Sequence, residues 1–221
     1  MPKRGLLIAI EGIDGSGKSS LALALKGHLE GRGLPVVLTK EPTDGEWGRR
    51  IKSLPLVGEE RMEKGEEPSS LFSLHPSPPL EELRLFVEDR KEHVRQVIRP
   101  ALEAGKVVIT DRYYLSTIAY QGALGIDTEE IRRVNEEFAP RPDLVLLLTL
   151  SPEMGMARIK ENRRLDRFER ERYLKRVDEI YSALAESEPY IRRLDAGRPF
   201  DEVVERALYC IDELFKRSSS P

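Results

Sequence analysis

Short apolar segments alternate along this chain with longer amphipathic segments. The apolar segments predict β-strands, and several of them are apolar on both faces, which is typical of a buried parallel sheet. Alternation of such strands with helices predicts βαβ units. We therefore expect a three-layer α/β fold, in which a parallel sheet of about five strands has helices on both faces. The predicted strands are Leu6–Ile10, Pro35–Thr39, Lys106–Thr110, Asp143–Leu150 and Tyr190–Leu194.

The amphipathic segments predict helices with recognisable beginnings and ends. Leu21, Leu25 and Leu29 share one face of the first, and glycines at 31 and 33 end it. Capping patterns open two later helices, one at 127–130 and one at Ser151 and Pro152. The predicted helices are Lys18–Gly31, Leu80–Ala104 with a kink at Pro100, Ile126–Phe138, a helix after Ser151, Arg170–Glu186 and Phe200–Lys216.

The chain of 221 residues is long enough for one sizeable α/β domain, and we predict a single domain over 1–221. One stretch, Leu54–Pro79, fits no element. It holds five prolines and an acidic run at 59–67, so it predicts a long loop.

Composition excludes several classes of protein. With 36 Lys and Arg against 39 Asp and Glu, the net charge of −3 argues against a nucleic-acid coat. No apolar run approaches the ~20 residues that cross a bilayer, and Glu11 interrupts the first one, so a membrane anchor or secretory signal is not expected. The single Cys210 suits a reducing cytoplasm. Abundant charges with only two Gln and two Asn favour a thermophilic source or a GC-rich genome, which composition does not separate.

The sequence GIDGSGKS at 12–19 matches the phosphate-loop motif GxxxxGK[ST] between a predicted strand and a predicted helix. Glycines let backbone N–H groups turn inward toward phosphate oxygens, and the helix adds the positive end of its dipole. We expect Lys18 to reach the β and γ phosphates and Ser19 to bind Mg²⁺. The predicted ATP-binding residues here are Gly12, Ile13, Asp14, Gly15, Ser16, Gly17, Lys18, Ser19 and Ser20.

A phosphate loop alone predicts only nucleoside triphosphate binding. A GTPase switch would carry an NKxD guanine motif, which this chain lacks. A DNA-processing ATPase and a small phosphotransferase remain, and the phosphotransferase needs a second site for an acceptor.

Two segments predict that second site. Asp111 and Arg112 follow a buried strand, at the edge of the sheet where ligands bind in open α/β folds. Asp111 is placed to hold Mg²⁺ and Arg112 to bind a phosphate bidentately, unless the pair is a simple strand-end salt bridge. Phe86 and Arg90 share a helix face and suit a planar base, although a core Phe beside a surface Arg gives the same spacing.

Three segments in this order resemble thymidylate kinases: EGIDGSGKSS, LRLFVEDRKEH and PALEAGKVVITDRYYLSTIAYQG. The resemblance runs from about Leu6 to Leu214. It implies the fold of phosphate-loop kinases and phosphoryl transfer from ATP to dTMP. It further implies Mg²⁺ as cofactor and a cytosolic homodimer.

The resemblance also implies residue roles at the acceptor site. Asp14 would bond the deoxyribose 3′-hydroxyl, and Arg112 would clamp the acceptor phosphate. Phe86 would stack on thymine and Arg90 would read a thymine carbonyl. The remaining implied contacts are Ser116 and Gln121 in the base pocket and Tyr120 against the sugar 2′ position, although these could also be ordinary helix-surface groups and a core aromatic.

A lid near 156–170 is implied to close over ATP. Thymidylate kinases carry an arginine either in the phosphate loop or in the lid, and Gly15 occupies the loop position here. The lid must then supply it, and a local surplus of five positive charges over 158–176 agrees, although a solvated charged helix would look similar. The candidate lid arginines are Arg158, Arg163, Arg164 and Arg167.

The loop after the last predicted strand would border adenine through Ala196 and Arg198. Two departures from the family pattern stand out. Lys40-Glu41-Pro42-Thr43 replaces Arg-Glu-Pro-Gly-Gly, which leaves Glu41 as a candidate to position metal or acceptor. The stretch Leu54–Pro79 is longer and richer in proline than in the family.

Two alternatives remain open from the sequence. One is another deoxynucleotide or deoxynucleoside kinase on the same scaffold. The other is a phosphate-loop ATPase of a nucleic-acid complex, against which the charge of −3 and the TIAYQG segment argue.

Overall fold

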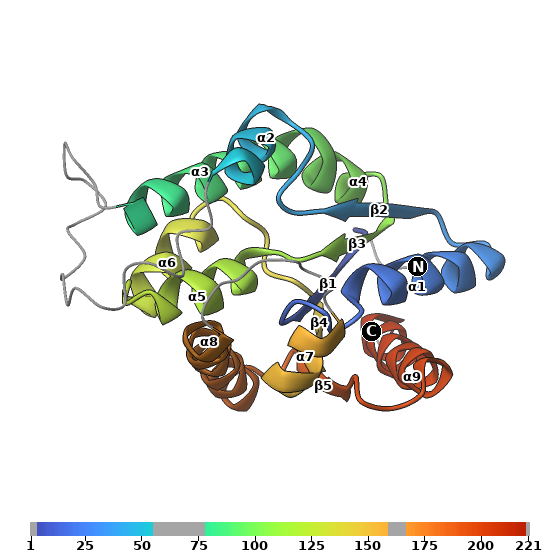
Figure 1. Ribbon diagram of the computed structural model, residues 1–221. Helices are drawn as coiled ribbons and strands as arrows, with labels where there is room; N and C mark the ends of the chain where they lie inside the picture. Colours follow the sequence, from blue (N-terminus) through green and yellow to red (C-terminus); the bar gives the residue numbers. More distant parts are fainter. Residues whose placement is uncertain (1–3, 55–77, 159–166, 220–221) are drawn as a thin grey trace.

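A computed structural model describes residues 4–54, 78–158 and 167–219 of the chain (Figure 1). Within these ranges one parallel sheet has the strand order β2-β3-β1-β4-β5. The strands are β1 (Leu6–Gly12), β2 (Val36–Lys40), β3 (Val107–Asp111), β4 (Leu144–Thr149) and β5 (Ile191–Asp195). The predicted number of strands and their parallel direction are confirmed, and their bounds differ by one or two residues.

The three central strands are the most apolar ones, since helices cover both of their faces. Every residue of β1 is buried, as are all but the last residues of β3 and β4. The parallel register pairs Ile10 with Asp111 and Gly12 with Leu148. The carboxyl ends of the strands therefore meet along one edge of the sheet, where the predicted site lies.

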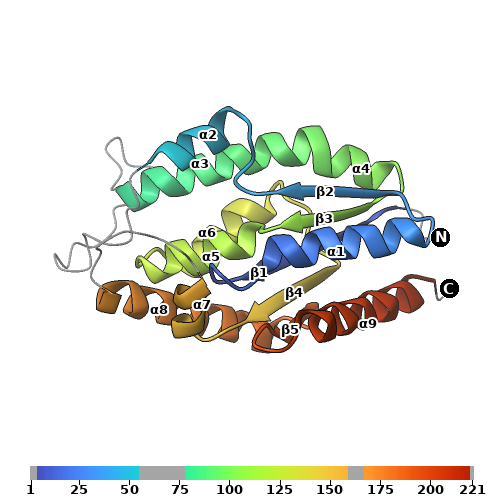
Figure 2. The ribbon, with the colours of Figure 1, turned by 45° about the vertical axis from the view of Figure 1, so that its right-hand side comes forward.

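Helices cover both faces of the sheet and form the outer layers (Figure 2). On one face α1 (Lys18–Gly31) contacts β1, β2 and β3, and α9 (Phe200–Ser219) contacts β4 and β5. On the other, α5 (Tyr114–Ala123) packs on β1 and against α8 (Arg167–Ser187). This arrangement confirms the predicted three-layer α/β fold.

The other helices connect these layers. α2 (Glu46–Ser53) packs on α3 (Pro78–His93), and α6 (Thr128–Glu136) packs on α5. α7 (Pro152–Arg158) follows β4. Both predicted caps form: Asp127 accepts from the N–H of Glu130 at 2.8 Å, and the Ser151 hydroxyl accepts from the N–H of Met154 at 3.3 Å.

The predicted long helix over 80–104 has its irregularity slightly earlier than the predicted kink at Pro100. α3 continues into a π-helical turn, η1 (Val94–Ile98), and then into α4 (Arg99–Glu103). The N–H of Arg99 donates to the carbonyl of Val94, five residues back. Because proline has no N–H to donate, the wider turn lets the helix continue past Pro100.

The pattern of apolar positions predicted neither α2 nor the bounds of α5. α2 is short and contains Gly48, and it is stabilised by packing on α3. The predicted loop at Leu54–Pro79 falls outside the described residues, except that Leu54 follows α2 and Pro78 opens α3.

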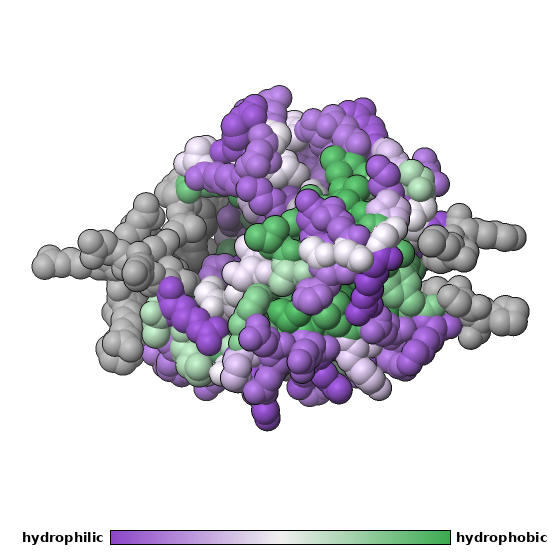
Figure 3. Space-filling view, turned by 90° about the vertical axis from the view of Figure 1, so that its right-hand side faces the viewer, coloured by the Kyte–Doolittle hydropathy of each residue, from purple (hydrophilic) through white to green (hydrophobic). Residues whose placement is uncertain are grey.

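The surface combines charged rims with smaller apolar areas. Figure 3 shows apolar side chains near the middle of one face, between polar margins. The edge strand β2 is only half-buried over Val36, Val37 and Leu38. None of the helices in the described ranges has the length and apolarity that crossing a membrane requires.

Candidate active site

The phosphate loop at 12–19 follows β1 directly, as predicted. Gly12, Gly15 and Gly17 have φ angles of 137°, 79° and 92°, which L side chains rarely adopt. A Cβ atom at Gly12 would also lie 2.5 Å from the carbonyl oxygen of Leu148 on the neighbouring strand. The glycines are therefore required by backbone conformation and by the close approach of β4.

The amino end of α1 is open toward this loop. Gly17 occupies the N-cap position in a left-handed conformation, and no side chain among the described residues caps the helix. The first-turn N–H groups are thus available for an anion, which a helix N-terminus favours. The Ser16 hydroxyl is buried and has no hydrogen-bond partner in the described part of the chain. It can therefore donate a hydrogen bond to a phosphate oxygen.

Lys18 is folded back into the loop rather than extended into solvent. Its Nζ donates to the carbonyl of Ile13 at 2.8 Å and lies 4.0 Å from a carboxylate oxygen of Asp14. Burial, and then repulsion from Arg112, lower the pKa of Lys18 to about 8. The positive charge of Lys18 is therefore only partly balanced by nearby negative charge, and a bound polyphosphate would provide the missing negative charge.

Ser19 and Asp111 come together where α1 begins and β3 ends. The Ser19 hydroxyl donates to Oδ2 of Asp111. Among the described residues no group of three His, Cys, Asp or Glu side chains could hold a metal by itself. A hydroxyl and a carboxylate still fit Mg²⁺, since this ion takes few protein oxygens and completes its shell with water and phosphates.

Arg112 is the centre of the predicted acceptor site. It has a φ of 68°, in the left-handed region, which for a residue other than glycine often marks a functional site. Its guanidinium donates to Asp14, to the Ser116 hydroxyl at 2.8 Å and to the Tyr120 hydroxyl at 3.3 Å. It also lies over the ring of Tyr120, 4.9 Å from the centroid. These contacts bring four predicted site residues together beside the phosphate loop.

Glu41 and Arg90 are also brought together, but they bind each other. Nε of Arg90 donates to Glu41 at 2.8 Å, and the other nitrogens donate to Asn135 at 2.5 Å and Thr117 at 3.0 Å. The second carboxylate oxygen of Glu41 lies 2.9 Å from Nδ1 of His93. Both side chains are thus engaged within the protein, and a direct substrate contact by either stays a prediction.

The predicted base-binding residues lie on the helices α3 and α5. Phe86 is half-buried. Nε2 of Gln121 donates to Glu82 at 3.0 Å, while its buried Oε1 has no partner among the described residues. Burial raises the pKa of Glu82, although the Gln121 amide opposes that shift. The amide oxygen of Gln121 can therefore accept from a ligand N–H.

The lid prediction is only partly covered by the structure. Arg163 and Arg164 lie outside the described residues, and Arg167 begins α8 without a described side chain. Arg158 ends α7 and donates to the carbonyl of Ala196 at 3.1 Å, so two predicted ATP-binding residues meet. Arg198 is exposed and lies near Glu202 and Asp195. The remaining predicted loop residue, Ser20, is exposed in the first turn of α1.

Helix α7 packs directly onto the phosphate loop. A Cβ atom at Gly15 would lie 2.4 Å from the carbonyl oxygen of Gly155, and one at Gly155 would lie 2.9 Å from that of Asp14. An arginine at position 15 would therefore displace α7, which agrees with the expectation that the lid carries the arginine.

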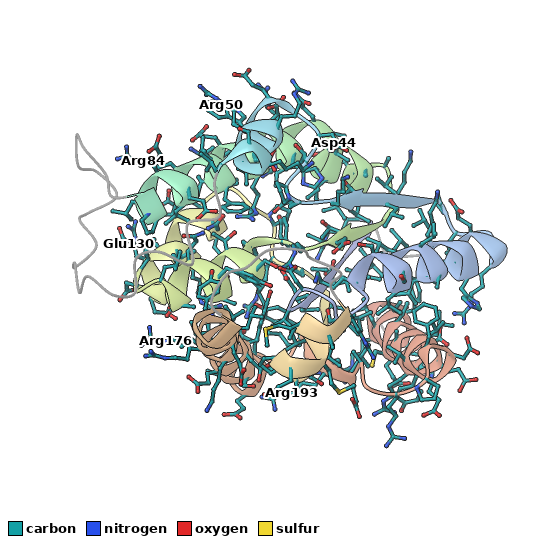
Figure 4. The ribbon with its side chains drawn as sticks, viewed as in Figure 1. Asp44, Arg50, Arg84, Glu130, Arg176 and Arg193 are labelled. Carbon is teal, nitrogen blue, oxygen red and sulfur yellow. The ribbon has the colours of Figure 1, made fainter. Side chains whose placement is uncertain are left out.

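Buried and surface arginines differ clearly in this structure. Figure 4 shows Arg50, Arg176 and Arg193 pointing outward from the molecule. The Arg90 side chain, in contrast, is only 1% exposed and that of Arg112 17%. Two of the arginines predicted at the candidate site are thus shielded from solvent.

The sequence did not indicate the buried residues that contact Ser116, the partner of Arg112. Glu11 is fully buried and accepts hydrogen bonds from Tyr113, Ser116 and Tyr181. A carboxylate at the end of an apolar strand was the available signal for Glu11. Tyr181 lies 170 residues further along the chain in an ordinary amphipathic pattern and gave no signal.

Comparison with known proteins agrees with this geometry. The family model described as thymidylate kinase matches residues 10–207. A thymidylate kinase of Desulfotalea psychrophila is 41% identical over 96% of both chains, and one of Brachyspira hyodysenteriae is 40% identical over 95% of both. A probable thymidylate kinase of Archaeoglobus fulgidus is 39% identical over 94% of this chain and 95% of its own. This chain belongs to the thymidylate kinase family.

Proposed function

We propose that this protein transfers the γ-phosphoryl group of ATP to dTMP, giving dTDP and ADP. The observation that carries the proposal is the contact between Arg112 and Asp14, since it joins a phosphate loop to a second cationic site. A donor and an acceptor phosphate bound at these two places would be neighbours, as in-line transfer requires.

In this proposal the protein positions and stabilises rather than abstracts a proton. A nucleotide phosphate is ionised at neutral pH, so its oxygen attacks without a general base. Lys18, the loop amides and the Ser16 hydroxyl hold the donor phosphates, and Arg112 orients the acceptor. The lid residues Arg158, Arg163, Arg164 and Arg167 would stabilise charge on the transferring group.

Mg²⁺ completes the proposed site. Ser19 and Asp111 would hold it, directly or through water, because their oxygens already face one another. Such an ion neutralises charge on the phosphate oxygens. Ala196 and Arg198 would border the adenine ring.

The acceptor base would lie between α3 and α5. Phe86 offers a ring for stacking. Oε1 of Gln121, which has no partner in the described part of the chain, offers an acceptor for the N3–H of thymine. We propose that Arg90 and Glu41 form part of the wall of this base-binding site and that Tyr120 faces the sugar. Ser116 acts in this proposal through its hydrogen bond with Arg112.

Initial rates of ADP release test the proposal when dTMP, dUMP, dCMP, dGMP and thymidine are supplied separately. We expect the largest kcat/KM with dTMP and background hydrolysis without an acceptor. A preference for another nucleotide, or for thymidine, would support a related kinase instead. ATP hydrolysis that needs no acceptor and rises with added DNA would contradict phosphoryl transfer to a nucleotide.

We also propose a single kinase domain over 1–221 that works as a cytoplasmic homodimer, on the strength of the family relationship. Light scattering of the purified protein would give twice the mass of one chain. A concentration-independent monomer that is fully active would overturn the dimer.

A further inference from the structure

The carboxylate of Glu11 lies one residue before the phosphate loop and receives four hydrogen bonds. Its Oε1 accepts from the backbone N–H groups of Tyr113 at 2.9 Å and Ser116 at 3.2 Å. Its Oε2 accepts from the Ser116 hydroxyl at 2.5 Å and the Tyr181 hydroxyl at 3.1 Å. The side chain is completely buried. All four partners are donors, so the site suits an ionised carboxylate better than any neutral group.

Two of these bonds hold the backbone around Arg112. Arg112 has a left-handed backbone conformation, which is unfavourable for residues other than glycine. Its N–H donates to Ile10 at 2.9 Å, and its carbonyl accepts from the Thr110 hydroxyl at 2.7 Å. On the other side, Glu11 holds the N–H of Tyr113. The strained residue is therefore fixed from both ends, and Glu11 provides the second end.

The third bond, from the Ser116 hydroxyl, reaches the guanidinium through that hydroxyl. The Ser116 hydroxyl donates to Glu11 and accepts from Arg112 at 2.8 Å, so it transmits the position of the carboxylate to the arginine. The opposite side of the guanidinium is held by Asp14. Burial raises the pKa of Glu11, while the Ser116 hydrogen bond and the charge of Arg112 lower it.

Tyr181 adds a link to a distant element. It comes from α8, which packs against α5, and its hydroxyl lies 3.0 Å from that of Ser116 and 3.1 Å from Glu11. The ring is buried, so the hydroxyl depends on these partners. The helix that begins at Arg167, within the predicted lid near 156–170, is thus tied to the acceptor site.

We propose that Glu11 and Tyr181 are positioning residues that hold Arg112 in the orientation that binds the acceptor phosphate. This inference rests on the proposed role of Arg112 in binding that phosphate. It assigns an effect on the phosphate of dTMP and none on its base or sugar.

Calorimetric titration with dTMP and with thymidine tests the inference, because the two ligands differ only in the phosphate. Tyr181→Phe removes one hydroxyl and should raise the Kd for dTMP roughly 3- to 10-fold, the net worth of one hydrogen bond. The Kd for thymidine should not change. Glu11→Gln should act in the same direction and more strongly. If that variant fails to fold, Tyr181→Phe decides.

Tyr114→Phe is the matched control. Tyr114 is equally buried, and its hydroxyl also donates to a carboxylate, Glu136 at 3.0 Å, on the side of α5 that faces α6. We expect it to leave both dissociation constants unchanged. Equal losses of dTMP and thymidine binding in Tyr181→Phe would show a general structural role and overturn the inference.

Arg112→Lys separates the inference from the proposed function. It should raise the Kd for dTMP and spare thymidine. If Arg112→Lys has no effect on dTMP, the proposed role of Arg112 is wrong. If Arg112→Lys weakens dTMP while Tyr181→Phe and a folded Glu11→Gln do not, the positioning role is overturned and the role of Arg112 stands.

Discussion

At the scale of single residues, the site holds charged groups out of water before any ligand arrives. Lys18 is buried, and among the described residues it has a backbone carbonyl at hydrogen-bond distance and a carboxylate at 4.0 Å. Removing an ammonium from water favours its neutral form, and a bound polyphosphate would reverse that preference. Binding of ATP should therefore be coupled to protonation of this lysine.

We predict that the protein takes up protons when it binds ATP at pH 8. The pKa of Lys18 is lowered to about 8, so about half of the free molecules carry a neutral lysine at that pH. Phosphate charges stabilise the ammonium and raise the pKa again, so about half a proton should enter per ATP. Titration calorimetry in buffers of different ionisation enthalpy measures this number.

The expected uptake decreases toward pH 7, where Lys18 is already mostly charged in the free protein. Lys18→Met provides the control and should show no uptake at pH 8. Equal uptake in the variant and the parent would place the titrating group elsewhere.

The residue scale also shows which parts of the site a sequence can predict. Lys18, Ser19 and Asp111 follow from local motifs and strand ends, and the structure places them together. The contacts of Glu41 and Arg90 could not be predicted from the sequence. His93 lies against Glu41 and Asn135 accepts from Arg90 only because α3 and α6 pack close to the end of β2. Local spacing carries no information on such contacts.

At the scale of elements, the close contact between α7 and the phosphate loop is made possible by glycine. Gly155 lies in α7, where alanine would otherwise be the better helix former. Its missing Cβ leaves room for the carbonyl of Asp14 and for Ile13. The position of α7, which leads into the predicted lid, thus depends on the absence of a side chain at Gly155.

Gly155→Ala should therefore destabilise the protein by about 1–3 kcal/mol, as overpacking does elsewhere. It should also raise the KM for ATP, because α7 must move away from the loop. Urea unfolding and steady-state kinetics measure the two effects.

Gly27→Ala is the matched control within α1. A Cβ atom there meets nothing within 4 Å, so the variant should be more stable than the parent by about 0.5–1 kcal/mol, with unchanged KM. Gly155→Ala behaving like Gly27→Ala would disprove the packing argument.

Periodicity predicted α1 because Leu21, Leu25 and Leu29 form one apolar face, and the capping pattern at Asp127 predicted α6. Periodicity did not predict the π-helical turn η1. That turn forms because Pro100 has no N–H, so a carbonyl in the preceding turn lacks its usual donor, and this effect does not appear in the pattern of apolar positions. Periodicity also did not predict α2, a short helix that packs against α3.

At the scale of the whole molecule, one buried ionic network joins elements that are far apart in sequence. Glu41 follows β2, Arg90 and His93 belong to α3, and Thr117 and Asn135 belong to α5 and α6. The side chains of Glu41 and Arg90 are 3% and 1% exposed. Removing one charge would leave the other buried without compensation.

Glu41→Gln should lower the free energy of unfolding by about 3–5 kcal/mol, the usual cost of breaking a buried ion pair. Glu137→Gln is the control, because its ion pair with Arg133 is on the surface, with both side chains more than 60% exposed, and should cost less than about 1 kcal/mol. Denaturant unfolding of both variants measures the difference. Similar losses would mean that the network contributes little to stability.

The central claim is that one molecule binds a donor and an acceptor phosphate side by side and passes a phosphoryl group between them. The most direct test is to follow dTDP and ADP together after mixing the protein with ATP, Mg²⁺ and dTMP. We predict that dTDP and ADP appear in equal amounts above a slow background of ATP hydrolysis, that only this background ADP forms without dTMP, and that Lys18→Met forms almost no dTDP. ADP that accumulates above this background without dTDP would contradict the claim.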